Sequence, residues 1–106
     1  MTDFSDMLSK AKAMQDKMRE AQEQIKKIEA EGEAGGNLVK VILTGDYELK
    51  SIIISEEAKK EDQEIINDLI IAAYNNAKEN LKKKSAEELF KVTGGLNLPS
   101  DFKLPF

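Results

Sequence analysis

From Asp3 to Glu31 the sequence contains neither glycine nor proline, and most of its residues are strong helix formers. An uninterrupted stretch of this kind predicts one long helix. Its apolar residues repeat at alternating spacings of three and four, which is the heptad pattern of a helix that packs along another helix. The residues of this heptad seam are Phe4, Met7, Ala11, Met14, Met18, Ala21, Ile25 and Ile28. We expect Thr2 or Asp3 to cap the start of the helix and Gly32 to end it, because glycine adopts the left-handed conformation without steric cost.

The predicted helix is too long for the domain that carries it. Its 29 residues would span about 43 Å at a rise of ~1.5 Å per residue. A compact domain of 106 residues has a radius of gyration of only about 13 Å. A heptad seam that runs past its own domain needs another apolar stripe to cover it, so the sequence predicts a homodimer. The alternative is that Met7, Met14 and Met18 pack on the chain's own sheet.

The hydrophobic period changes in the middle of the chain. Asn37 to Thr44 and Tyr47 to Ser55 are rich in β-branched residues, and both predict strands. Gly45-Asp46 supplies a two-residue hairpin loop between them. Gly35-Gly36 could supply a second turn, which would make residues 32–34 a short first strand, although three residues before a diglycine could equally form a loop. The expected result is a three-stranded antiparallel meander.

A second long helix is predicted from Glu61 to about Val92. It could break near Lys84-Ser85, because Ser85 followed by Glu88 matches a capping box. The residues from Leu96 to Phe106 form an apolar, proline-containing tail, which we expect to pack on the protomer or its dimer mate; a partner-binding peptide is the alternative. The fold class is therefore α+β, with a long N-terminal helix, the meander, a long second helix and the tail in one domain, residues 1–106.

Composition excludes most kinds of catalytic site. The chain has no cysteine and no histidine, so thiolate nucleophiles, zinc-thiolate sites and the commonest general base are absent. We expect a protein that is not an enzyme, with no catalytic residues, cofactor, metal or small-molecule substrate. The first residues resemble no signal or transit peptide, and no apolar run is long enough to span a membrane. These features predict a cytoplasmic protein without a membrane partner.

Two clusters could suggest ligand sites. Six acidic residues between Glu56 and Asp68 could hold a hard cation through oxygen ligands. We favour the alternative that they complement the positive end of the second helix dipole. The diglycines Gly35-Gly36 and Gly94-Gly95 lack the context of a phosphate-binding loop, so we interpret them as turns.

Basic residues gather on both predicted helices, although the net charge is −4. Lysines in such clusters can neutralise phosphates of duplex DNA without reading its sequence. The alternative is that they simply form solvated helix surfaces. With one arginine and no tryptophan, the chain is poorly equipped for base readout. The candidate DNA-binding residues are Lys10, Lys12, Lys17, Arg19, Lys82, Lys83 and Lys84, with Lys26 and Lys78 as secondary candidates.

Several short segments together resemble a known family over essentially the whole chain. They are Glu31-Gly32-Glu33-Ala34-Gly35-Gly36, Leu38-Val39-Lys40-Val41, Asp68-Leu69-Ile70, Ala72-Ala73, Asn75-Asn76-Ala77, Thr93-Gly94-Gly95-Leu96 and Pro99 through Phe106. In this combination the sequence resembles the YbaB/EbfC family of bacterial nucleoid-associated proteins. Ser100-Asp101 departs from the family, which often has proline or glycine there.

The resemblance implies an α-β-β-β-α fold and a tweezer-like homodimer joined through its sheets. It also implies binding of double-stranded DNA, a role in nucleoid organisation or gene expression, and no enzymatic activity. It identifies no general set of DNA-contacting side chains, so the lysines remain an inference from charge. The alternative function is a protein-interaction or holdase-like module, in which paired helices clasp another polypeptide through the methionine-rich heptad seam.

Overall fold

The computed structural model describes residues 3–93, with side chains placed for residues 4–92. The elements in chain order are α1 (Asp3–Lys26), β1 (Glu29–Ala34), β2 (Val39–Thr44), β3 (Leu49–Ile54), a 3-10 turn η1 (Ala58–Lys60) and α2 (Gln63–Thr93). The three strands form one antiparallel sheet in the order β1-β2-β3. The predicted α+β class and the meander are confirmed. The predicted packing of the tail, residues 96–106, and a cap at Thr2 lie outside the described residues.

The first helix ends earlier than predicted. α1 stops at Lys26, where Lys27 and Ile28 form short-range backbone bonds to Gln24 and Ile25. The prediction that Gly32 ends this helix is wrong, because residues 29–34 pair with β2 over their whole length. Strand pairing prevails over helix propensity here because it buries Ala30 completely in the core.

The turns of the sheet also differ in length from the prediction. Residues 35–38 form the first turn, with positive φ angles of 65° at Gly35, 60° at Gly36 and 77° at Asn37. The second loop is longer than the predicted Gly45-Asp46 pair, because Tyr47 also has a positive φ of 64° and the Thr44 N–H bonds to the Glu48 carbonyl at 2.9 Å. β3 therefore begins at Leu49 rather than at Tyr47.

The second helix is continuous, so the predicted break near Lys84-Ser85 is wrong. Ser85 is buried and lies on the helix face that also carries Leu81 and Leu89, both buried. This face packs on the sheet and on α1, and a break at Ser85 would interrupt the packing. The capping box is therefore not used. The helix begins at Gln63, two residues after the predicted start.

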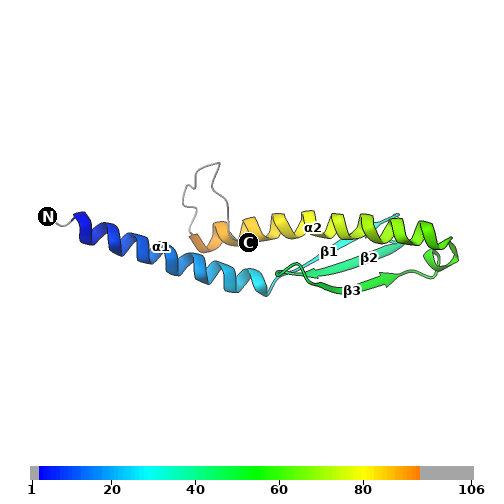
Figure 1. Cartoon of the computed structure of the whole chain (residues 1–106), viewed down its shortest axis with the longest axis horizontal. Coiled ribbons are helices and arrows are strands. Elements are labelled where there is room, and N and C mark those ends of the chain that lie inside the picture. Colours follow the sequence, from blue (N-terminus) through cyan, green and yellow to red (C-terminus); the bar gives the residue numbers. More distant parts are fainter. Residues whose placement is uncertain (1–2, 94–106) are drawn as a thin grey trace.

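α2 lies across one face of the sheet, and no helix covers the other face within residues 3–93 (Figure 1). The core between them contains Val39, Val41 and Leu43 of β2 together with Ala73 and Ala77 of α2, all fully buried. Gly32 makes the close approach possible, since a Cβ there would lie 2.1 Å from the carbonyl oxygen of Ala73 and 2.2 Å from the backbone nitrogen of Ala77. Gly32 is therefore a packing residue.

The molecule is strongly elongated. Its radius of gyration is 19.2 Å, and its extents are 72 × 23 × 17 Å, whereas a compact chain of this length has a radius of about 13 Å. The N-terminal half of α1 projects beyond the described end of α2 (Figure 1). The 24 residues of α1 span about 36 Å. The expectation that the first helix extends beyond its domain is confirmed, although the helix is shorter than predicted.

Candidate nucleic-acid interface

The heptad seam of α1 is covered only towards its C-terminal end. Ala21 and Ile25 are buried, and α2 is the element that packs against this helix. In the projecting half, Phe4 is 73% exposed, Met7 65% and Leu8 56%. The projecting half of α1 therefore presents an apolar stripe to solvent in the single chain.

Lys10 and Lys17 lie on one flank of that exposed stripe. Together with Ala13 and Met14 they line a shallow groove of about 300 Å³. Both lysine side chains belong to exposed residues, whereas Met14 is half-buried. The arrangement places two cations, about 10 Å apart along the helix axis, on either side of an apolar floor.

Lys12, Arg19 and Lys26 lie on the opposite flank of α1. At 3.6 residues per turn, Lys12 is about 160° around the axis from Lys10. Arg19 is 4.0 Å from Asp16, and both side chains are largely exposed, at 68% and 60%. An ion pair this exposed contributes little, so it leaves the guanidinium accessible to a ligand. The two flanks face different directions and cannot meet one straight surface together.

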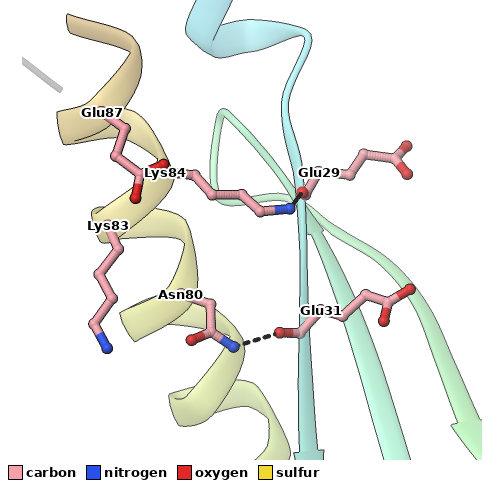
Figure 2. Close-up of a pocket in the computed structure, with 6 residues that line it drawn as sticks. All are labelled: Glu29, Glu31, Asn80, Lys83, Lys84 and Glu87. Atoms are coloured by element: carbon pink, nitrogen blue, oxygen red, sulfur yellow. Dashed lines mark hydrogen bonds between the residues drawn. The ribbon is translucent and has the colours of Figure 1, made fainter. Parts of the chain in front are cut away.

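The three consecutive lysines of α2 also point in different directions. Lys82 lies 3.7 Å from Glu79 on the same helix. Lys84 reaches β1, where its Nζ donates a hydrogen bond of 2.8 Å to the carbonyl oxygen of Glu29. Lys83 extends along the helix without crossing to the strand (Figure 2). Consecutive helix positions are ~100° apart, so these residues do not form one cationic surface.

The groove between β1 and α2 is larger, at about 570 Å³, but two of its hydrogen-bond donors are already bonded to β1. The residues that line it are Glu29, Glu31, Asn80, Lys83, Lys84 and Glu87. The side chains of Glu29 and Glu31 point away from the groove (Figure 2) and pair with Lys50 and Lys40. Among the lining residues, Glu87 therefore supplies the carboxylate beside the ammonium groups of Lys83 and Lys84. The groove is therefore a poor cradle for a phosphate, because Asn80 and Lys84 already donate to the carbonyl oxygens of Glu31 and Glu29, although it includes two candidate DNA-binding lysines.

The two sets of candidate lysines lie apart along the long axis. Lys10 lies in the projecting half of α1 and Lys17 two turns further along the same helix, whereas Lys83 and Lys84 lie beside the start of β1 (Figure 2). A single chain therefore does not bring all candidate residues onto one surface. Lys78, a secondary candidate, is exposed on α2.

The acidic residues before and within the start of α2 are spread along the chain rather than gathered into one cluster. Within residues 3–93, no group of three or more acidic, histidine or cysteine side chains is arranged to hold a metal ion. Lys59 instead pairs with Glu56 at 3.0 Å, and Glu64 occupies the first turn of α2. Glu64 thus has the position expected for dipole complementation.

Asn76 and Asn80 are polar residues whose role the sequence reasoning missed. The Glu33 N–H donates to Asn76 Oδ1 at 3.0 Å, and Asn80 Nδ2 donates to the Glu31 carbonyl at 2.7 Å. A signal was available in the sequence. Asn76 directly precedes the small residue Ala77 of the predicted helix, and Asn80 follows Ala77 by three residues. Small residues permit a close approach, and nearby polar side chains can then reach backbone groups of the neighbouring strand.

Comparison with known proteins assigns this arrangement to a family. Residues 1–96 match the model of the YbaB/EbfC DNA-binding family. The chain belongs to the YbaB/EbfC family. Among its relatives are nucleoid-associated proteins of Granulibacter bethesdensis, Agrobacterium fabrum and Mesorhizobium japonicum, which are 43%, 45% and 44% identical to it, each over 107 aligned positions that cover 100% of both chains. Across residues 3–93 of this family member, no helix is both long and apolar enough to cross a membrane.

Proposed function

We propose that this YbaB/EbfC family member binds double-stranded DNA as a homodimer, through contacts between its basic side chains and backbone phosphates. In this proposal it works in the bacterial nucleoid, in the cytoplasm, and influences nucleoid organisation or gene expression. Residues 1–106 act as a single DNA-binding domain, and the protein is a binding protein rather than an enzyme.

The observation that carries the proposal is the exposed pair Lys10 and Lys17 on α1. Their axial separation of about 10 Å is close to three nucleotide steps of one strand, at about 3.4 Å each. The groove between them has an apolar floor and no carboxylate in its lining. Local charge of this kind supports phosphate contact even though the whole chain carries a net charge of −4.

Exposed apolar side chains on the sheet support the homodimer. On β3, Leu49 is 49% exposed, Ile52 41% and Ile53 51%. Association through the sheets would cover these side chains and place two projecting α1 helices in one assembly. Two copies would double the number of lysines available to one duplex, which raises affinity without base-specific contacts.

The test is fluorescence anisotropy of a labelled duplex titrated with protein at several salt concentrations. Saturable binding is expected, with log affinity falling by about 0.9 per neutralised phosphate for each decade of salt. The variant Lys10→Gln/Lys17→Gln should bind more weakly and with a shallower slope than the parent. Lys59→Gln/Lys60→Gln is the matched control, because it removes the same charge from exposed positions of η1. Equal loss in both variants would contradict a specific role for α1.

A second candidate function is a holdase-like helical clamp, which the exposure of Phe4, Met7 and Leu8 favours. Such a module would bind unfolded polypeptides through this stripe. The test is suppression of aggregation of an unfolding client protein by the parent and by Met7→Gln/Leu8→Gln. Suppression lost in the variant, together with no binding of DNA at low salt, would favour the clamp over the DNA-binding proposal.

A further inference from the structure

The two edge strands of the sheet, β1 and β3, differ in how far other parts of the chain bond to their outer backbone groups. In an antiparallel sheet, the backbone groups of alternate residues on an edge strand point outward, away from the neighbouring strand. On β1 the outward groups belong to Glu29, Glu31 and Glu33, since the three side-chain contacts from α2 reach these residues. Unpaired outward groups are a template for strand addition by another chain.

Three side chains of α2 occupy this edge. Asn76 accepts from the Glu33 N–H at 3.0 Å. Asn80 donates to the Glu31 carbonyl at 2.7 Å, and Lys84 donates to the Glu29 carbonyl at 2.8 Å (Figure 2). Three of the six outward backbone groups of these residues are therefore bonded within the chain.

The spacing of the three side chains matches the strand. Asn76, Asn80 and Lys84 are four residues apart, so they form one row along the helix that spans about 12 Å at ~1.5 Å per residue. Residues 29 to 33 span about 13 Å at ~3.3 Å per residue. The helix and the strand are thus in register over the whole row, with the helix running opposite to β1.

Close packing holds the row in place. α2 approaches β1 until its backbone lies against Gly32, beside Ala73 and Ala77. At this separation the short side chains of Asn76 and Asn80 reach the strand backbone. A longer distance between helix and strand would leave the asparagines unable to bond to it.

The β3 edge has no such cover. The pairs Lys40↔Ile53 and Ile42↔Ser51 bond β3 to β2, so the backbone groups of Ile52 and Ile54 point outward. Within residues 3–93, no hydrogen bond involves these outward groups. The side chain of Ile52 is also 41% exposed. β3 is therefore available to pair with another strand.

We infer that Asn76, Asn80 and Lys84 close the β1 edge, so that strand pairing with a second copy is confined to β3 and ends at two chains. This inference rests on the proposed homodimer. A sheet with two open edges can add chains without limit, whereas a sheet with one open edge closes after a single symmetric pairing. The three residues are positioning residues for assembly. Lys84 is consequently bonded to β1 in the closed edge, and contact with DNA would require its release.

The first experiment measures assembly of the full chain by sedimentation velocity over a hundredfold range of concentration. The parent should reach a limit of two chains, whereas Asn76→Ala/Asn80→Ala should form species larger than two chains that increase with concentration. Asn67→Ala/Asn75→Ala is the matched control, because it removes two exposed asparagines from the same helix and should behave as the parent. A double variant that also stops at two chains, with parental circular dichroism, would overturn the inference.

The second experiment measures hydrogen exchange at the Glu33 amide by nuclear magnetic resonance, and it does not depend on dimerisation. In Asn76→Ala this amide should exchange at least tenfold faster than in the parent, while amides buried in β2 keep their rates. An unchanged rate would overturn closure of the edge at this position.

Asn80→Leu removes the hydrogen-bond donor but keeps a branched side chain of similar shape. It replaces the double variant in the sedimentation experiment if the double variant loses its folded circular dichroism spectrum. If the parent sediments as a monomer, the homodimer proposal fails. The Glu33 exchange rate and any association of the double variant would still test whether Asn76 and Asn80 close the β1 edge.

Discussion

The helix α1 and the C-terminal half of α2 both carry lysines, but the environments of these lysines differ. Lys10 and Lys17 flank an open groove whose lining has no carboxylate. Lys84 is bonded to the backbone of β1, and Lys82 lies 3.7 Å from the carboxylate of Glu79. The comparison shows that a cluster of cations in a sequence does not by itself make a cationic surface, because neighbouring backbone and carboxylates can engage the same charges.

The largest effect is expected from a substitution that separates α2 from β1, because the environment of Lys84 depends on their contact. Gly32→Leu places a side chain against backbone atoms of Ala73 and Ala77, 2.1 and 2.2 Å from the position of its Cβ. Backbone cannot move aside cheaply, so we expect a loss of more than about 3 kcal/mol of unfolding free energy, measured by urea denaturation. Gly36→Ala is the control, because no atom lies within 4 Å of the added Cβ and only the positive φ of 60° opposes it; its expected cost is about 1 to 2 kcal/mol. Similar costs for both variants would contradict the role of Gly32 in packing.

The next largest effect compares the apolar faces of the two helices. Leu81 on α2 is fully buried, whereas Met7 on α1 is 65% exposed. Leu81→Ala should lower the unfolding free energy by about 2 to 5 kcal/mol through the cavity that it leaves, whereas Met7→Ala should change it by less than about 0.5 kcal/mol. Urea denaturation at low concentration, where association is weakest, measures both. A large loss in Met7→Ala would mean that the stripe on α1 is buried in solution, as an α1 interface between two copies would require.

A smaller effect separates the lysines themselves. Lys84→Met removes a solvent-exposed hydrogen bond to the Glu29 carbonyl and should cost about 0.5 to 1 kcal/mol of unfolding free energy. Lys10→Met removes an exposed ammonium and should leave stability within about 0.5 kcal/mol while weakening binding of DNA. Thermal denaturation and the anisotropy titration, performed on both variants, test this division. Equal stability together with equal loss of DNA affinity would show that Lys84 acts as a DNA contact like Lys10.

The smallest effect concerns the exposed ion pair between Arg19 and Asp16. Its atoms are 4.0 Å apart and both side chains are exposed, so Asp16→Asn should change the unfolding free energy by less than about 1 kcal/mol. Binding of DNA should become slightly tighter at low salt, because a negative charge near the proposed interface is removed. Weaker binding would indicate that Asp16 positions Arg19 for the contact. Anisotropy at two salt concentrations distinguishes these outcomes.

Much of the fold followed from local patterns. The heptad spacing predicted a long first helix, and the β-branched stretches predicted β2 and β3. The boundaries that were wrong have a common cause. Glu29 to Glu31 are good helix formers that form a strand because β2 offers them paired hydrogen bonds, and Ser85 is a good capping residue that stays inside α2 because its helix face is buried.

The sequence by itself determined the order of elements and the candidate cations, because helix period, strand composition and charge are local properties of the chain, and its short motifs carried the resemblance to the family. Only the tertiary structure decided that Gly32 is a packing residue, that Lys84 bonds to β1, and that Asn76 and Asn80 cover one edge of the sheet. Each of these contacts joins residues more than 40 positions apart. Their existence depends on the distance at which α2 packs on β1, and a one-dimensional pattern does not contain that distance.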